Sequence, residues 1–395
     1  MWKELAEKGS RTGRGNGGSG ASGGTSLAGK KLAGREILSQ EHFRRGLRQE
    51  RKRTERSRRP FVLLLVGSDT LLDPHCETNA MEDILPALGR STRETDLVGW
   101  HENRSVLGII FTEVKAGANR RAVADALLAK VDKALSGVLS MDQIDEIHLS
   151  VHLFPDDWEN EEPESPADRT LYPDLTAEDW TKKSSRHLKR LMDIGGSLMA
   201  LAVFAPLVLV IAVLIKLNSK GPVHFRSNRI GQFGRPFTFL KFRSMRTGSD
   251  PAIHKQFVTE LITGNNGSSH SNGDSGDTYK LTADPRITPI GRFLRRTSLD
   301  ELPQFINVLR GDMSLVGPRP PLPYEVTCYD IWHKERLMAV KPGITGLWQV
   351  NGRSRVKFDD MVRMDLEYAQ GWSLWLDLKI LLLTPRAVLS GTGAY

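Results

Sequence analysis

The spacing of apolar positions divides the chain into regions that differ in their hydrophobic pattern. Short apolar runs over residues 61–66, 106–111 and 147–153 predict strands, and apolar residues at helical spacing over 83–88 and 122–135 predict helices. With residues 106–111 as part of a hairpin, the order is strand, helix, strand, strand, helix, strand. This order is typical of a split ferredoxin-like unit, so we expect an α+β domain in the first half of the chain.

A long run without charged residues, Ile194–Ile215, separates this region from the rest. At about 1.5 Å per residue, a helix of this length could cover a hydrocarbon core of roughly 30 Å. Pro206 removes a backbone hydrogen bond near its middle, and Gly195 and Gly196 weaken its start. We therefore expect the helix to break at Pro206.

Both flanks of the apolar run are basic. The residues are Lys182, Lys183, Arg186, Lys189 and Arg190 before it, and Lys216, Lys220, Arg226 and Arg229 after it. Such flanks favour both ends on the cytoplasmic side of a membrane. A membrane re-entrant helix over residues 190–217 satisfies both the break and the charges. A kinked spanning helix and a buried helix of a soluble protein remain alternatives.

Composition narrows the functional classes. The chain has 395 residues, 39% of them hydrophobic, which excludes a polytopic transporter, a collagen and a wholly disordered chain. Its two cysteines, Cys76 and Cys328, cannot form a disulfide framework and have no metal-ligand neighbours at zinc spacing. The net charge of +8 is compatible with nucleic acid, anionic lipid or a phosphate-rich substrate.

Polar stretches mark the expected domain limits. Residues 9–34 are mostly small and polar, so we expect a disordered tail, and the low-complexity stretch 264–277 is expected to be a mobile loop. Residues 44–59 are densely basic, as on a solvated helix face or a surface for an anionic membrane or nucleic acid. The expected organisation is a tail and basic segment over 1–59, an α+β domain over 60–155, an acidic linker over 156–184 and a second domain over 185–395.

The densest group of candidate catalytic residues follows the apolar run. Residues 237–245 alternate like a strand that carries cations, and residues 284–304 combine arginines with an acidic pair, Asp300 and Glu301. An aspartate near so many cations should stay ionised. A structural alternative is a capping box, in which Ser298 caps a helix and Glu301 reaches back to it.

Five sequence blocks follow one another in the second half of the chain: Lys189–Asp193, Lys241–Met245, Thr297–Gln304, Met313–Pro320 and Lys341–Val350. These blocks and their order resemble those of the bacterial sugar transferase family. Its members are monotopic phosphoglycosyl transferases, which load a sugar phosphate onto polyprenyl phosphate. The resemblance covers residues 185–395 and implies a mixed α/β domain with a membrane re-entrant helix. Where members often have Ser before the helix-breaking proline, this chain has Ala205, so the hydroxyl is missing and Pro206 remains.

The first half resembles a degenerate diguanylate-cyclase-type domain, a nucleotide-cyclase-like fold, notably over residues 91–100. Where that family carries Gly-Gly-Asp-Glu-Phe, residues 101–105 are His-Glu-Asn-Arg-Ser, so cyclase activity is not expected. Larger sugar transferases often have amino-terminal membrane helices, and here a soluble domain takes their place. We expect this domain to be regulatory or dimerising.

The transferase resemblance implies a reaction in two steps. Asp300 attacks the β-phosphorus of a nucleotide diphosphate sugar, expected to be a UDP-sugar, and the nucleoside monophosphate leaves. Polyprenyl (undecaprenyl) phosphate then takes the phosphosugar from the aspartate, which initiates polysaccharide or glycan biosynthesis. The substrate is an anion, so the site has to neutralise charge. The implied groups are Mg²⁺ placed with help from Asp300 or Glu301, and phosphate-directed cations from Arg295, Arg319, Lys241 and Arg296.

Two further pieces concern the membrane. Lys189 and Asp193 are about one helical turn apart and are spaced to form an ion pair where the chain enters the membrane, as an anchor or a lipid-phosphate contact. Residues 372–383 combine two tryptophans with apolar bulk, as in an interfacial helix or a core helix.

The expected partners are a nucleotide sugar, polyprenyl phosphate and the membrane, with no nucleic acid and with homo-oligomers left open. The expected location is the bacterial inner membrane, both soluble parts facing the cytoplasm. Competing functions are an inactive membrane-attached regulator, a nucleic-acid binder, and a glycosyltransferase that moves the sugar without its phosphate. The last would release a nucleoside diphosphate.

Overall fold

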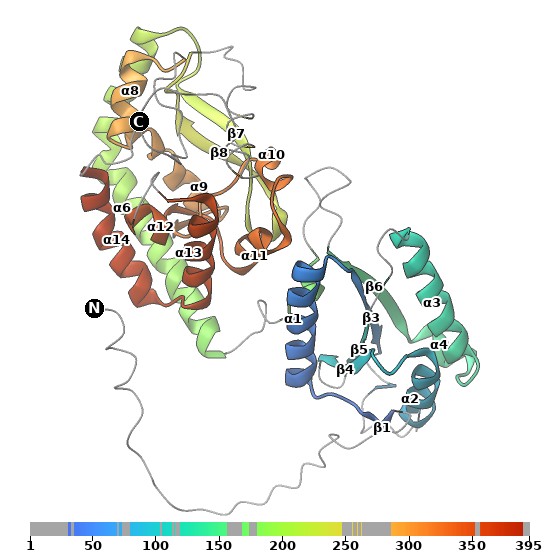
Figure 1. Cartoon of the computed structure of the whole chain (residues 1–395). Helices are drawn as coiled ribbons and strands as arrows, with labels where there is room; N and C mark the ends of the chain where they lie inside the picture. Colours follow the sequence, from blue (N-terminus) through green and yellow to red (C-terminus); the bar gives the residue numbers. More distant parts are fainter. Residues whose placement is uncertain are drawn as a thin grey trace, which may run out of the picture.

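In a computed structural model, the chain forms two domains, shown with their connection in Figure 1. The structure describes residues 31–32, 35–68, 71–72, 80–102, 105–112, 114, 119–155, 168–173, 180–246, 255, 259, 262, 286–351 and 356–389. The expected loop over 264–277, and the expected tail over 9–34 except residues 31 and 32, lie outside the described residues.

The amino-terminal domain is built on an antiparallel sheet of four strands in the order β4-β5-β3-β6. Its elements are β1 (Lys31–Leu32), β2 (Arg35–Glu36), α1 (Gln40–Ser57), β3 (Phe61–Gly67), α2 (Ala80–Ser91), β4 (Leu97–Glu102), β5 (Val106–Phe111), α3 (Arg120–Ser136), α4 (Met141–Asp145) and β6 (His148–Phe154). Helices α2 and α3 occupy the two crossovers. The split ferredoxin-like order predicted from the sequence is therefore confirmed.

Strand β3 is buried on both faces because successive side chains point to opposite sides of the sheet. Phe61, Leu63 and Leu65 share an apolar cluster with Phe43 and Leu47 of α1. The intervening residues of β3 share a second cluster with α2 and α3. The densely basic stretch is thus mostly helical, and the apolar side of α1 covers the sheet.

The carboxy-terminal domain mixes helices with short strands. Its elements, with the segment leading into it, are η1 (Arg169–Leu171), α6 (Trp180–Asn218), β7 (His224–Ile230), η2 (Gln232–Gly234), β8 (Pro236–Phe242), α8 (Pro289–Arg296), η3 (Leu299–Glu301), α9 (Gln304–Arg310), β9 (Ser314–Val316), α10 (Pro323–Val326), α11 (Ile331–Ala339), β10 (Gly343–Thr345), α12 (Leu347–Asn351), α13 (Phe358–Gln370) and α14 (Leu374–Leu389). Strands β7 and β8 form an antiparallel hairpin, and β9 pairs with β10 in parallel.

Helix α6 is continuous over 39 residues and contains Pro206. The break expected at Pro206 is therefore absent from the helix. Contacts on both sides of the proline explain how the helix continues despite one lost backbone hydrogen bond. On one side, Arg190 donates hydrogen bonds of 2.6 and 2.8 Å to carbonyls near the end of α9. On the other, Ile211 and Ile215 share an apolar cluster with Leu294 of α8.

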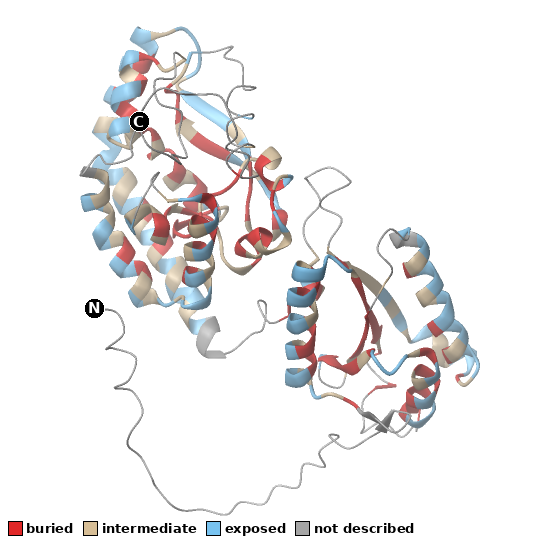
Figure 2. Cartoon of the chain, in the orientation of Figure 1, coloured by how far each residue is buried: buried red, intermediate tan, exposed pale blue. Residues whose placement is uncertain are grey.

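Helices α6, α8 and α14 have many exposed residues (Figure 2), and large apolar side chains are among them. The most exposed include Leu198, Met199, Val203, Leu209 and Val210 on α6, Phe293 on α8, and Trp375 and Leu382 on α14. Residues Ser184–Asn218 are long and apolar enough to cross a membrane, and only 11% of their most apolar stretch is buried. Exposed apolar surface of this extent is typical of a protein or membrane contact. The long apolar helix thus indicates membrane association.

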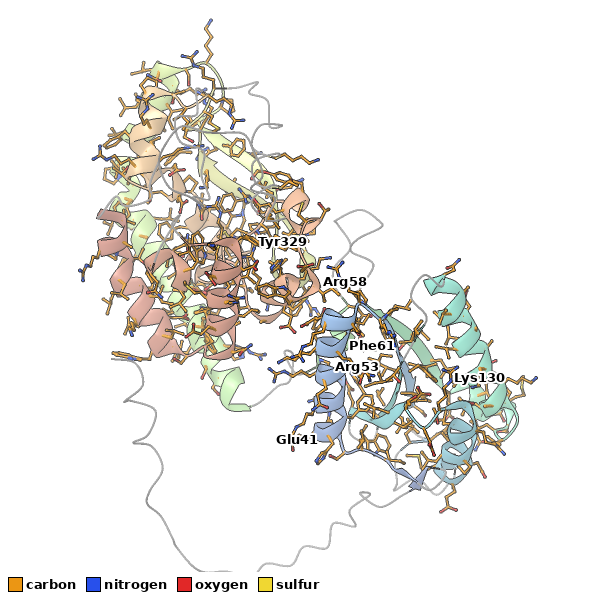
Figure 3. All side chains as sticks on the ribbon, viewed as in Figure 1. Glu41, Arg53, Arg58, Phe61, Lys130 and Tyr329 are labelled. Atoms are coloured by element: carbon orange, nitrogen blue, oxygen red, sulfur yellow. The ribbon has the colours of Figure 1, made fainter. Side chains whose placement is uncertain are left out.

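The two domains touch at the hairpin turn and at the end of α1. Arg58, labelled in Figure 3, forms an ion pair of 3.4 Å with Asp330 beside α11. The Arg169 guanidinium lies 4.2 Å from the centroid of the Phe233 ring, in the turn between β7 and β8. Residues of both domains belong to one apolar cluster, in which Tyr172 is buried. The hairpin turn therefore contacts the segment that follows the amino-terminal domain, and Arg58 at the end of α1 contacts the carboxy-terminal domain directly.

Candidate active site

The acidic pair expected to carry the chemistry converges on one lysine. Lys241 Nζ lies 2.9 Å from Glu301 Oε1 and 3.7 Å from Asp300 Oδ2. The side chain of Asp300 is 8% exposed and that of Glu301 is 29% exposed. An ammonium group between two carboxylates in a partly buried site offsets part of their negative charge and can also bind an incoming phosphate. The structure thus brings together three of the residues selected from the sequence.

A sharp turn places the two carboxylates. Helix α8 ends before Ser298, which adopts a left-handed conformation with φ 55° and ψ 18°. Such a conformation is uncommon for a residue other than glycine. The Ser298 side chain makes no capping hydrogen bond, and the Glu301 carboxylate binds Lys241. The alternative of a capping box is therefore wrong, because the Glu301 side chain pairs with Lys241 of β8 and not with the backbone of Ser298.

Asn307 on α9 holds the strand that carries Lys241. Its Oδ1 accepts a hydrogen bond of 3.1 Å from the Leu240 N–H, and its Nδ2 donates one of 2.7 Å to the Thr238 carbonyl. Asn307 is completely buried. It joins β8 to the helix that follows Asp300, so it fixes the distance between the lysine and the acids. Sequence reasoning missed it, although an amide within an apolar helical run needs a buried partner.

The selected arginines occupy different settings. Arg295 Nε donates a hydrogen bond of 2.9 Å to Ser244 Oγ, in the same sequence block as Lys241. Arg319 is half-buried in a loop, and the carbonyls of both flanking prolines accept hydrogen bonds, from Gly343 N–H and from an arginine of β7. Arg296 is exposed at the end of α8. Arg295 and Arg319 are thus held in place more firmly than Arg296.

Lys189 and Asp193, which were expected to pair with each other, bind separate partners. Lys189 Nζ lies 2.7 Å from Asp377 Oδ2, which belongs to α14. Asp193 Oδ1 accepts hydrogen bonds from Ser314 Oγ at 3.0 Å and from Leu315 N–H at 2.9 Å. The predicted ion pair is therefore wrong, because α6 packs against β9 and α14 and both charges find partners there.

Asp377 is the largest omission from the sequence reasoning. Its side chain is fully buried and accepts hydrogen bonds from Lys189, from Tyr368 at 2.6 Å and from Trp372 at 3.1 Å. Burial and the Asp377 carboxylate raise the pKa of Tyr368 far above its ordinary value, so its hydroxyl remains a donor. The sequence signal for Asp377 is a single carboxylate within an apolar helix, because a charge that is buried in such a helix needs a partner of opposite charge.

Asp300 and Glu301 are the candidate ligands for Mg²⁺ in this site. Among the described residues, no cluster of three or more His, Cys, Asp or Glu side chains could hold a metal ion. Mg²⁺ is usually bound through one or two carboxylates together with substrate phosphates and water. Asp300 and Glu301 fit such a shared site, in which the substrate supplies further oxygen ligands.

Comparison with known proteins assigns the second half of the chain. Residues 184–391 match the family described as bacterial sugar transferase. The galactosyl transferase CpsE of Streptococcus agalactiae is 46% identical over 207 residues, 52% of this chain and 43% of that protein. The undecaprenyl-phosphate galactose phosphotransferase of Salmonella typhimurium is 42% identical over 216 residues, 54% of this chain and 43% of that protein. The chain thus spans less than half the length of these relatives.

A solved structure is similar to part of the chain. The diguanylate cyclase SiaD of Pseudomonas aeruginosa, in complex with its activator SiaC, has 17% sequence identity and a TM-score of 0.22. The match covers 31% of this chain and 48% of that one.

Proposed function

The chain belongs to the bacterial sugar transferase family, and we propose that it transfers a sugar 1-phosphate from a nucleotide diphosphate sugar to undecaprenyl phosphate. The products are a nucleoside monophosphate and an undecaprenyl diphosphate sugar, the starting unit of a polysaccharide. The observation that carries the proposal is the contact of Asp300 and Glu301 with Lys241 inside the family match. The name of the Salmonella relative supplies the lipid acceptor.

The first step uses Asp300 as the nucleophile. A carboxylate oxygen bonds to the β-phosphorus, the bond from that phosphorus to the bridging oxygen breaks, and its electron pair leaves with the nucleoside monophosphate. In the second step a phosphate oxygen of the lipid attacks the same phosphorus and restores the carboxylate. Two displacements replace one difficult transfer between two anions. Lys241, within 3.7 Å of Asp300, reduces the repulsion between the carboxylate and the phosphate.

Arginines of the same domain would meet the remaining charge of the phosphates. Arg295 and Arg319 are suited to bidentate contacts with phosphate oxygens, and Arg296 is placed for a weaker, solvent-exposed contact. Asp300 and Glu301 would hold Mg²⁺ together with the diphosphate. When bound, the ion neutralises charge that develops on the phosphate oxygens. Lys241 supplies the resident positive charge before the substrate arrives.

The contacts of α6 support a helix that does not cross the membrane and keeps both of its ends on the same side. Asp193 binds β9, and Ile211 packs against α8. At about 1.5 Å per residue, these two contact points are separated by roughly 27 Å of helix. A domain on one side of a hydrocarbon core of roughly 30 Å cannot reach both ends of a helix that crosses it. Both soluble parts would then face the cytoplasm, where nucleotide sugars are made.

A second candidate is transfer of the sugar without its phosphate. The name of the Streptococcus relative, a galactosyl transferase, describes that type of reaction. The nucleotide product separates the two reactions, because phosphosugar transfer releases a nucleoside monophosphate and sugar transfer releases a diphosphate. The contact of Asp300 and Glu301 with Lys241 favours phosphosugar transfer, since attack on phosphorus requires a nucleophile beside a cation.

Nucleotide release from the full chain, purified in detergent, tests the proposed function. With Mg²⁺, undecaprenyl phosphate and a panel of UDP-sugars, we expect UMP release with one or a few of the sugars. Chelation of Mg²⁺ or omission of the lipid should reduce multiple turnover to background. The ion supplies positive charge that the site lacks, and the lipid is the second reactant. Release of UDP would support sugar transfer, and no release by folded protein would support an inactive regulator.

Replacement of Lys241 tests the charge balance of the site. Lys241→Gln is expected to lower kcat by about 10²- to 10³-fold, the usual effect of removing one group that stabilises transition-state charge. The measurement is the UMP release rate at saturating donor and lipid. Lys133→Gln, at an exposed position of α3, is the matched control and should behave like the parent chain. A normal rate for Lys241→Gln would remove this lysine from the mechanism.

A further inference from the structure

A buried arginine ties the end of α6 to the strand that carries Lys241. Arg243 directly follows β8 and is 5% exposed. Its Nη2 donates hydrogen bonds of 2.7 Å to the Ser219 carbonyl and 2.8 Å to the Ser219 hydroxyl, and its Nη1 donates one of 3.0 Å to the Lys220 carbonyl. Carbonyls at the end of a helix have no partner within it, so donors from elsewhere have to satisfy them. Arg243 therefore holds the carboxyl end of α6.

The same strand brings Lys241 to the acidic pair. Lys241 stands two residues before Arg243, which corresponds to roughly 7 Å of extended chain. Its Nζ lies 2.9 Å from Glu301 Oε1 and 3.7 Å from Asp300 Oδ2. A displacement of the backbone at Arg243 would therefore move the ammonium group relative to both carboxylates.

Apolar packing joins the same parts of the domain. Ile215, near the end of α6, shares a buried cluster with Phe242. Phe242 stands between Lys241 and Arg243 in the chain, and Leu302, next to the acidic pair, belongs to the same cluster. Apolar contacts have little directional preference, whereas hydrogen bonds fix both distance and orientation. The Arg243 guanidinium therefore sets how β8 lies against the helix end, and the cluster fills the space between them.

The helix end that Arg243 holds is apolar on its outer side. Val210, Val213 and Leu217 are 53, 51 and 80% exposed. A bilayer that covers these side chains would hold this part of α6 in place. Arg243 is then a polar link between the membrane-associated helix and the strand of Lys241.

We propose that Arg243 is a positioning residue, which fixes β8 against the end of α6 and thereby places Lys241 beside Asp300 and Glu301. The inference rests on the proposed function and adds to it a residue that touches neither substrate. Arg243 acts through Lys241, by keeping the ammonium group where the β-phosphate meets the attacking carboxylate. The position of α6 in a bilayer and the geometry of the site are thus linked.

Turnover of Arg243 variants tests the positioning role. Arg243→Met should lower kcat for UMP release by about 10- to 100-fold, the scale of a small misplacement of a catalytic group, with a smaller effect on the KM values. Arg243→Lys keeps a charged donor for the Ser219 carbonyl and should lose less activity. It replaces Arg243→Met if thermal unfolding shows that the latter does not fold. Arg310→Met, exposed at the end of α9, is the matched control and should have the parent rate.

A double-mutant cycle with Lys241→Gln tests whether Arg243 acts through the lysine. Once the ammonium group is absent, its misplacement has no effect. Arg243→Met should therefore lower the rate of Lys241→Gln by a much smaller factor than it lowers the parent rate, since residues that act through one another are not additive. Equal fold losses in the two backgrounds, or a parental kcat in folded Arg243→Met, would overturn the assignment.

Hydrogen exchange of the strand gives a readout that does not depend on turnover. Amide protons of residues 237–242 should exchange faster in Arg243→Met than in the parent chain, and those of β3 should not change. Unchanged exchange in β8 would refute the inference while the proposed function stands. If the parent chain transfers no phosphosugar, the proposed function is wrong, and the exchange comparison still decides whether Arg243 holds the strand.

Discussion

Asp300→Asn is expected to lower turnover by about 10³-fold or more, the scale seen when a covalent nucleophile is removed. The amide that replaces the carboxylate cannot form the bond to the β-phosphorus. The fold should survive, because Glu301 remains 2.9 Å from Lys241 and keeps the lysine paired. The measurement is UMP release under saturating donor and lipid, together with mass analysis of the protein. The parent chain should gain the mass of a phosphosugar when lipid is withheld, and the variant should not.

Matched variants separate nucleophilic attack from a change in charge. Glu301→Gln removes the same charge from the neighbouring position and should keep more activity than Asp300→Asn. Asp125→Asn, exposed on α3, should have the parent rate. Parental turnover by Asp300→Asn would show that another group attacks the phosphorus, and the assigned mechanism would be wrong.

Lys189→Met is expected to lower the free energy of unfolding by about 3 kcal/mol. Removing one partner of a buried ion pair leaves an uncompensated charge, which commonly costs about 3–5 kcal/mol. The lower end applies because Lys189 is 15% exposed and because Tyr368 and Trp372 still donate to Asp377. The measurement is denaturant unfolding of the detergent-purified chain, followed by tryptophan fluorescence.

A double variant tests the cause of this loss. Lys189→Met combined with Asp377→Asn removes both charges but keeps an oxygen that accepts from Tyr368 and Trp372, so it should recover much of the stability. Lys133→Met on the surface of α3 should stay close to the parent. If the single variant Lys189→Met unfolds at the parental denaturant concentration, the pair contributes little to holding α6 against α14.

The elements that the sequence predicted well are those whose pattern is local. The strand predicted over residues 61–66 and the helix over 122–135 lie within β3 and α3, because burial imposes a period of two or of 3.6 residues on the segment itself. The order of these segments was sufficient to identify the ferredoxin-like arrangement. The acidic pair was selected for its surroundings in sequence, and the structure adds its contact with Lys241.

The misses share one physical cause, which is a partner distant in sequence. Ser298 and Glu301 have the spacing of a capping box, but the Glu301 carboxylate accepts a hydrogen bond from Lys241 instead. Lys189 and Asp193 have the spacing of a helical ion pair, but each binds another element. Local rules describe what an isolated helix would do, with energies of a few tenths of a kcal/mol per pair. Buried tertiary contacts are stronger and decide the outcome.

The stacking of Arg169 on Phe233 is a contact through which a change in one half of the chain would affect the other. Phe233 lies in the turn between the strand of Arg229 and the strand of Lys241. A molecule that binds the amino-terminal half more tightly when this stacking is formed would increase the fraction of chains in which the stacking is present. It would thereby favour the hairpin geometry that accompanies the stacking. Reciprocity then requires that a donor favouring that geometry strengthens the binding of the molecule by the same factor. The affinity of the amino-terminal domain for an effector would thus report how fully the distant site is occupied.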